Sequence, residues 1–210
     1  MSTSVVCVSR TLAAGGEELG RAVAEQLGFR YADDEILDRA AEKAGVSRDA
    51  VAGAERPPGL LMRILESMAT AQVAEAGAWT TMPSLSSSAG DPSSSYEELI
   101  QDVIREFATQ GKVVIVAHGG SACLRGVPSV LRVLVTAPVE VRIDRLSKAA
   151  EIDAGRAKKA VTESDKRRQE YFQRFYHARE DPTDYDLVVN TDVLGVQGAA
   201  KLVAQAADHG

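Results

Sequence analysis

The stretch from Val5 to Gly28, VVCVSRTLAAGGEELGRAVAEQLG, constrains the fold more than any other part of the chain. It opens with a short apolar run typical of a buried strand and passes through a turn of small residues. It then continues as a predicted helix over 16–27, with Leu19, Val23 and Leu27 on one face. A buried strand that leads directly into an amphipathic helix favours a parallel sheet, because parallel strands need crossover connections.

The rest of the chain repeats this alternation. We therefore expect an α/β fold, a three-layer parallel sheet with helices on both faces, formed by one domain over residues 1–210. The predicted central strands are Val5–Ser9, Val113–Ala117, Leu131–Val135 and Leu187–Asn190, with a weaker strand at 29–32 and helices at 33–44, 155–180 and 196–207. Helical insertions are expected at about 46–95 and, as a lid-like region, at about 150–180.

Composition narrows the class of protein. The chain is 45% hydrophobic and 26% charged, which is ordinary for a globular domain. Its formal net charge of −6 argues against a general nucleic-acid or anionic-lipid surface, and no apolar run approaches the roughly 20 residues of a membrane span. We therefore expect no nucleic-acid or membrane partner. Cys7 and Cys123 follow no metal or disulfide spacing, so reduced thiols and a cytoplasmic location are expected.

Two stretches interrupt the alternation. Residues 46–80 are expected to be helical, with Leu61, Ile64 and Leu65 at helical spacing; this helix packs on its own domain or, over 58–80, forms a homodimer seam. Residues 81–95 are rich in Ser, Pro and Gly and predict a mobile loop on the substrate side.

The turn after the first strand has the layout of a phosphate-binding loop, in which backbone N–H groups and the helix N-terminus hold an anion. The usual pattern is Gly, four residues, then Gly-Lys-Ser/Thr. We align the second glycine of this pattern with Gly15. The first glycine of the pattern then falls on Arg10 and the lysine on Gly16. If one extra residue is allowed after the lysine, the hydroxyl residue falls on Glu18. The lysine and the hydroxyl are absent, and Glu17 and Glu18 oppose a polyphosphate. The alternative is a purely structural turn.

Four segments bear on this choice: SRTLAAGGEELGRAVAEQLGFRYADDEIL, VVIVAHGGSACLRGVPSVLRVLVTAPVEVRIDRL, DKRRQEYFQRFY and DPTDYDLVVNT. In this order they resemble the cytidylate kinase-like family, a branch of the P-loop nucleoside monophosphate kinases. The resemblance covers the ends of the chain and most of the sequence after Tyr96, and is poor from about 50 to 95. It implies a P-loop kinase fold, with ATP and Mg²⁺ as cofactors and a nucleotide or another small phosphate acceptor as partner.

The resemblance assigns phosphate binding to Arg10, Ala13, Ala14, Gly15 and Gly16. In the family a Ser-Arg pair precedes a Gly-Gly turn that has no lysine, so the missing lysine is a family trait. Ala13 stands where a glycine is usual. No residue of this chain is assigned as a metal ligand.

The acceptor side is assigned to Asp33, His118, Asp165 and Arg168. His118 replaces the arginine of a family Gly-Arg-Gly motif that contacts the acceptor phosphate, and a neutral histidine cannot make a bidentate fork. The alternative for His118 is a hydrogen-bonded residue at a strand end. Asp165 and Arg168 match the aspartate and arginine that contact the nucleoside monophosphate, and the alternative there is an exposed charged helix.

Arg142 and Arg145 resemble the arginines on the helix after the fourth strand, one helical turn apart. Such arginines clamp the transferring phosphate, so we assign them a catalytic role. Solvated charges paired with Glu140 and Asp144 are the alternative. Beside the last strand, the adenine of a nucleotide would lie near Thr191.

Two function classes are consistent with these residues. The first is a phosphotransferase that acts on a nucleoside monophosphate or another small acceptor. The second is a catalytically inactive kinase-like protein that binds a nucleotide or a protein partner and regulates it. A dinucleotide-binding dehydrogenase fails, because AAGGEELG does not have the Gly-x-Gly-x-x-Gly spacing.

Overall fold

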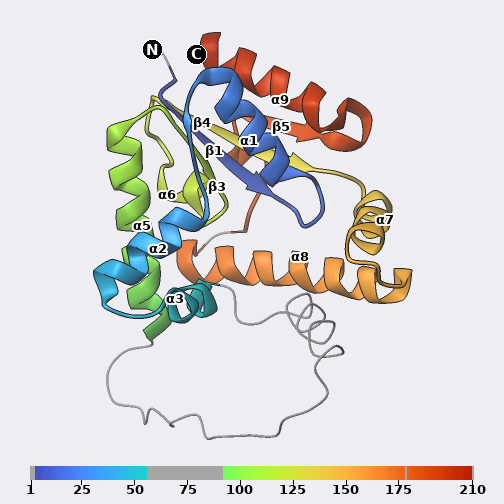
Figure 1. Cartoon of the computed structure of the whole chain (residues 1–210), viewed down its shortest axis with the longest axis horizontal. Helices are drawn as coiled ribbons and strands as arrows, with labels where there is room; N and C mark the ends of the chain where they lie inside the picture. The colour runs from blue at the N-terminus through green and yellow to red at the C-terminus, as the bar shows by residue number, and fades with distance from the viewer. Residues whose placement is uncertain (1–2, 56–91, 178, 210) are drawn as a thin grey trace, which may run out of the picture.

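The computed structural model describes residues 3–55, 92–177 and 179–209. Its centre is a five-stranded parallel sheet with the order β2-β3-β1-β4-β5 (Figure 1). The strands are β1 (Val5–Arg10), β2 (Arg30–Ala32), β3 (Val113–Val116), β4 (Val130–Thr136) and β5 (Leu187–Asn190). The predicted parallel sheet is confirmed, but β5 lies at its edge rather than among the central strands.

The middle strand, β1, sets the register of the sheet. Val5 pairs with Val113 of β3 and Val130 of β4, and Val8 pairs with Val116 of β3. Residues Val5–Ser9 are buried, because helices cover both faces. This two-sided burial explains why the strand reads as an unbroken apolar run instead of alternating polar and apolar residues.

One face of the sheet is covered by α1 (Gly16–Leu27) and α9 (Thr191–His209). Leu19 and Val23 of α1 and Val203 of α9 pack against the even-numbered valines of β1. The predicted helix over 16–27 is confirmed at both ends. The final helix begins earlier than expected, with a turn over Thr191–Leu194, and breaks at Gly195 (φ 64, ψ 165).

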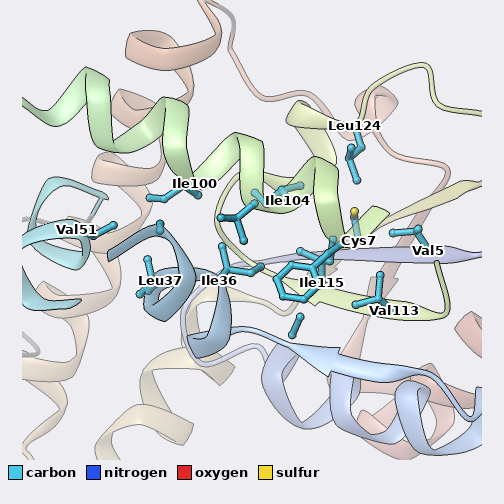
Figure 2. Packing of buried hydrophobic residues seen from close by; sticks show 14 of the residues in the cluster. Val5, Cys7, Ile36, Leu37, Val51, Ile100, Ile104, Val113, Ile115 and Leu124 are labelled. Atoms are coloured by element: carbon cyan, nitrogen blue, oxygen red, sulfur yellow. The ribbon is translucent and has the colours of Figure 1, made fainter. Parts of the chain in front are cut away.

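The other face is covered by α2 (Asp34–Ala44), α3 (Arg48–Glu55), α5 (Pro92–Gln110) and α6 (Gly120–Cys123). Figure 2 shows side chains of α2, α3 and α5, together with Leu124 after α6, packed in one cluster with Val5, Cys7 and Ile115. At about 25 cal/mol per Å² this apolar burial is the main stabilising term of the fold. Both cysteine thiols are free, and Cys7 is buried in this cluster, as expected.

The remaining helices, α7 (Val139–Ala149) and α8 (Ala154–Tyr176), pack on each other through a third cluster that contains Leu146 and Val161. Leu12 and Ala13, from the turn after β1, pack against this cluster. In Figure 1 the long α8 lies below the sheet, and α7, which follows β4 in the chain, lies above one end of α8. A single 3₁₀ turn, η1 (Pro182–Asp184), leads into β5.

The insertion is described only in part. Residues 92–95 belong to the start of α5, so the predicted loop over 81–95 is wrong at that end. Pro92 is the first residue of the helix, where its fixed φ suits the first turn and its missing N–H is not needed. Residues 81–91 of that loop and the 58–80 dimer segment lie outside the described residues.

Among the described residues, no helix combines the length and apolar character that a bilayer span requires.

Candidate phosphate-binding site

The turn between β1 and α1 has left-handed backbone at two alternate positions, Ala13 (φ 61) and Gly15 (φ 80). Ala14 between them is fully buried. Alternation of this kind turns successive N–H groups toward one concavity, the arrangement that binds anions. A glycine is required at 15 for space as well, because a Cβ there would lie 2.7 Å from Cγ2 of Val196.

Most N–H groups of this turn have no acceptor within the part of the chain that the structure describes. The first helical hydrogen bond of α1 runs from the N–H of Leu19 to the carbonyl of Gly15, at 3.0 Å. From the end of the turn into the first turn of α1, the N–H groups without an acceptor in the described part of the chain are those of Ala13, Gly15, Gly16, Glu17 and Glu18. These five donors and the positive end of α1 have the chemistry that suits an anion at the carboxyl edge of the sheet.

The carbonyl groups of the same turn are bound from the opposite side. Nη1 of Arg168 donates to the carbonyl of Arg10 at 2.8 Å, and the hydroxyl of Thr191 donates to that of Ala14 at 2.7 Å. Nη1 of Arg142 makes a longer contact of 3.5 Å with the carbonyl of Leu12. Side chains from α7, α8 and α9 thus hold three carbonyls at the end of β1 and in the turn.

Arg145 acts on this turn through Thr191. Its Nη1 donates to the Thr191 hydroxyl at 2.8 Å and its Nη2 to the Thr191 carbonyl at 3.1 Å. Thr191 is fully buried at the end of β5, so its hydroxyl can accept from Arg145 while it donates to Ala14. The hydroxyl expected beside an adenine is instead part of the loop's support.

Arg142 is 3% exposed and is committed to protein partners. Its two terminal nitrogens donate to the two carboxylate oxygens of Asp165 at 2.8 and 2.7 Å, and its Nε donates to the carbonyl of Ala137 at 3.2 Å. The solvated alternative for Arg142 is wrong, since Asp144 pairs with Lys148 instead. The structure brings together Arg142 and Asp165, which the sequence assigned to different roles.

Arg168 makes a second two-armed ion pair, with Glu180. The nitrogen–oxygen distances are 2.6 and 2.5 Å, and the Tyr185 hydroxyl donates to the same carboxylate. Burial alone would lower the pKa of Arg168, but the hydrogen bonds and charge of Glu180 outweigh it and hold the pKa above its ordinary value. Arg168 is therefore no exposed helix charge, in contrast to Lys166 on the same helix.

Arg10 lies at the mouth of the turn. Its Nε is 2.5 Å from a carboxylate oxygen of Glu17, and its aliphatic stem covers Gly16. A Cβ on Gly16 would lie 2.5 Å from the Cβ of Arg10. A lysine at 16, where related loops carry one, does not fit this backbone.

Asp33 and His118 meet where β2 and β3 end. Nε2 of His118 is 3.0 Å from one carboxylate oxygen of Asp33, and the Tyr31 hydroxyl donates to the other at 3.0 Å. Burial alone would raise the pKa of Asp33, but the bonds from His118 and Tyr31 and the charge of Arg10 hold it below its usual value. His118 is buried, which supports its interpretation as a hydrogen-bonded strand-end residue.

The backbone after β3 is left-handed at three successive residues, Ala117 (φ 66), His118 (φ 51) and Gly119 (φ 67). The Tyr176 hydroxyl of α8 donates to the Gly119 carbonyl at 3.3 Å. A Cβ on Gly119 would clash with the hydroxyl oxygen of Tyr176 and would lie 2.9 Å from the hydroxyl oxygen of Tyr171. The end of α8 thus closes directly over this turn, and only glycine fits beneath it.

The described residues contain no metal centre built by protein side chains alone. Nowhere in residues 3–55, 92–177 and 179–209 do three or more His, Cys, Asp or Glu side chains gather in a way that could hold a metal ion. The donors present suit an anion, and a Mg²⁺ ion there would take its oxygen ligands chiefly from phosphate and water.

Comparison with known proteins agrees with this geometry. The sequence model of the cytidylate kinase-like family matches residues 5–193. This chain belongs to the cytidylate kinase-like family. A cytidylate kinase from Methanocaldococcus jannaschii is 30% identical over 120 residues, which span 54% of this chain and 67% of that protein.

Solved structures extend the cytidylate kinase-like assignment to the fold. An uncharacterized protein from Eubacterium ventriosum superposes with a TM-score of 0.68 at 16% identity, covering 98% of each chain. Shikimate kinase from Acinetobacter baumannii, solved in complex with shikimate, gives a TM-score of 0.51 at 13% identity, with 97% of this chain and 92% of that one covered. At these identities the likeness establishes the α/β P-loop kinase-like fold alone.

Sequence reasoning on this cytidylate kinase-like chain missed the partners of its arginines. Glu180 and Glu17 each hold an arginine, and neither was assigned that role. Glu180 follows α8 in a segment with no recognisable motif, so no signal pointed to it. Glu17 did carry a signal, because a carboxylate in the first turn of a supposed anion site needs a cation nearby.

Proposed function

We propose that this chain is a phosphotransferase that moves a phosphoryl group from ATP to a nucleoside monophosphate or another small phosphate-bearing acceptor. The observation that carries the proposal is that five of the six N–H groups from Ala13 to Glu18, all but that of Ala14, have no protein acceptor among the described residues. They lie at the carboxyl end of the central strand. Open parallel sheets bind ligands at that edge. Because such substrates are cytoplasmic metabolites, the proposal also places the protein in the cytoplasm.

The residues divide into two groups under this proposal. Ala13, Gly15 and Gly16 hold phosphate oxygens through their N–H groups, and Arg10 supplies positive charge beside them. Arg142 and Arg145 shape the loop and are positioning residues, because they donate to the Leu12 carbonyl and to Thr191. Ala14 is held in place through its carbonyl, which accepts from the Thr191 hydroxyl. In this family catalysis by positioning and charge screening requires no covalent step by the protein.

The acceptor lies between the loop and the edge formed by β2 and β3 in this proposal. Asp33 and His118 line one side, and Asp165 and Arg168 on α8 lie on the other. ATP, when bound, supplies the transferable phosphoryl group. Mg²⁺ has no cluster of protein ligands among the described residues, so the chain's own part is to orient and screen the phosphates.

A catalytically inactive regulator is the second candidate, and one observation favours it. All four arginines around the loop already have protein partners: Glu17 for Arg10, Asp165 for Arg142, Thr191 for Arg145 and Glu180 for Arg168. An active enzyme must release at least one of them to the substrate. A regulator that only binds a nucleotide needs no such exchange.

The test measures ADP formation from ATP-Mg²⁺ with a panel of nucleoside monophosphates, together with calorimetric titration of ATP. Acceptor-dependent ADP formation supports the phosphotransferase, whereas ATP binding without ADP supports the regulator. Absence of ATP binding by the folded protein would contradict both.

A matched pair of variants localises the acceptor. Arg168→Lys keeps the charge but loses the two-armed geometry, and hydrogen bonds to charged groups contribute about 1.5–3 kcal/mol, so kcat/KM should fall about tenfold or more. Arg167→Lys is the control, because Arg167 donates to the Glu163 carbonyl on its own helix and should stay near wild type. Equal losses in both variants would remove Arg168 from the site.

A further inference from the structure

Arg10 and Glu17 form an ion pair inside the proposed phosphate site. Arg10 ends β1 and Glu17 is the second residue of α1, and their Nε and Oε1 atoms are 2.5 Å apart. The Arg10 side chain is 16% exposed and that of Glu17 is 42% exposed. The carboxylate is therefore free to move into solvent, while the guanidinium is held near the loop.

The position of Arg10 is fixed by its own packing. Its Cβ and Cδ lie over Gly16, where a Cβ would approach them to 2.5 and 2.8 Å. Its charge is also close enough to Asp33 to help lower the pKa of that carboxyl. Arg10 thus lies between the loop's N–H groups and the end of β2, the two sides between which a phosphate would pass.

The same packing excludes a lysine at 16. Since the stem of Arg10 fills the space above Gly16, the positive charge of the site has to come from the strand end instead of from the helix. Arg142 and Arg145 contact the Leu12 carbonyl and Thr191 rather than the loop's N–H groups. Arg10, by contrast, packs over Gly16, one of the residues whose N–H has no acceptor in the described part of the chain.

We infer that Arg10 and Glu17 act as a counter-ion switch, which rests on the proposed phosphate site. With the site empty, Glu17 holds the Arg10 guanidinium. A doubly charged phosphate takes this guanidinium from Glu17, because it accepts the two-armed hydrogen bonds and the loop's N–H bonds together. The Glu17 carboxylate is exposed and returns to water when it leaves Arg10, which limits the cost of the exchange.

The switch makes the site selective for the charge of its ligand. A monoanion must compete with a carboxylate of equal charge for Arg10, whereas a phosphate dianion or a polyphosphate has the greater charge. Glu17 therefore suppresses the binding of single-charged anions and lowers the affinity for phosphates without abolishing it. The ligand class is a phosphate monoester or a di- or triphosphate.

The experiment is calorimetric titration of pyrophosphate, without metal, into wild type, Glu17→Gln, Glu18→Gln and Arg10→Gln. Glu18→Gln is the matched control, because it removes the same charge from the same helical turn and Glu18 is exposed. A charge at a helix N-terminus changes affinity about two- to fivefold, and this gain is expected of Glu18→Gln. Glu17→Gln should gain at least about tenfold, because it also removes the carboxylate that competes with the ligand for a charge-assisted hydrogen bond from Arg10, and Arg10→Gln should lose binding.

The double variant Arg10→Gln/Glu17→Gln separates the pair from general electrostatics. If the two residues act as a switch, the gain from Glu17→Gln disappears once Arg10 is gone, so the two effects are not additive. Additive effects, or equal gains from Glu17→Gln and Glu18→Gln, would overturn the switch while leaving the proposed function intact. Failure of all the folded proteins to bind pyrophosphate or ATP would overturn both.

Discussion

The guanidinium of Arg142 and the carboxylate of Asp165 form a two-armed ion pair between α7 and α8, with nitrogen–oxygen distances of 2.8 and 2.7 Å. The Arg142 side chain is buried, and the Asp165 side chain is about one third exposed, at 34%. The pair fixes the angle at which α8 leaves α7, and Arg142 also contacts the carbonyl of Leu12 in the loop. Loop geometry and helix packing therefore depend on the same side chain.

Asp165→Asn should destabilise the fold, because it leaves the buried charge of Arg142 with one neutral acceptor in place of a carboxylate. The expected loss is about 1–3 kcal/mol in the free energy of unfolding, measured with urea. Asp144→Asn is the control; it breaks the exposed pair with Lys148 and should change stability by less than about 0.5 kcal/mol. Similar small losses in both would show that Asp165 is not structural.

Ala13→Gly should leave stability unchanged or raise it by up to about 1 kcal/mol. Left-handed backbone costs about 1–2 kcal/mol in a residue with a Cβ, and glycine loses roughly 0.5–1 kcal/mol through the unfolded chain. Ala22→Gly, in the middle of α1, is the comparison and should lower stability by about 1 kcal/mol. Thermal unfolding of both variants decides this, and a clear loss from Ala13→Gly would contradict the φ of 61 at that residue.

Gly15→Ala should be more damaging than Gly28→Ala, although both glycines have positive φ. Gly28 has nothing within 4 Å of an added Cβ, so its substitution costs only the backbone term of about 1–2 kcal/mol. At Gly15 the Cβ meets Val196 at 2.7 Å, which adds about 1–3 kcal/mol for overpacking. Denaturant unfolding of the two variants gives the difference, and equal losses would show that α9 yields at Val196.

Asp33 should contribute to stability against acid. Its folded-state pKa lies below the ordinary value of 3.8, so its stabilising effect is complete above about pH 4 and is lost as the pH falls through the folded pKa. Asp33→Asn should therefore lower the free energy of unfolding at pH 7, and the difference from wild type should shrink below about pH 4. A difference that stays constant from neutral to strongly acidic pH would exclude titration of Asp33 as the cause.

The sheet was predictable from the sequence because its strands are buried on both faces. Runs such as VVCV and VVIV can be read only as buried strands when Gly-rich turns and amphipathic helices follow them. The start of α5 was not predictable in the same way. Serine and proline predict a loop by composition, and only tertiary packing of the later turns makes Pro92 the start of a helix.

The candidate site was predictable as a set of residues but not as a set of contacts. Arg142, Asp165 and Arg168 were all singled out, yet their pairing depends on how α7 and α8 cross, which no local pattern records. His118 was assigned to the acceptor side, with a hydrogen-bonded strand-end residue as the alternative, and no sequence pattern predicted its contact with Asp33. Asp33 and His118 meet because β2 lies beside β3 in the sheet, and this strand order could not be derived from the sequence pattern around either residue.

Hydrogen bonds to the loop's carbonyl groups also affect its N–H groups, because each carbonyl shares a peptide unit with the N–H of the next residue. The Leu12 carbonyl shares a peptide unit with the N–H of Ala13, and the Ala14 carbonyl shares one with the N–H of Gly15. A hydrogen bond to the carbonyl oxygen draws electron density across the amide and makes its N–H more positive. A hydrogen bond that this N–H then donates is stronger by about 10–30%. Arg142 on Leu12 and Thr191 on Ala14 are such donors. These side chains therefore polarise the amides of the proposed phosphate site from the carbonyl side of the loop.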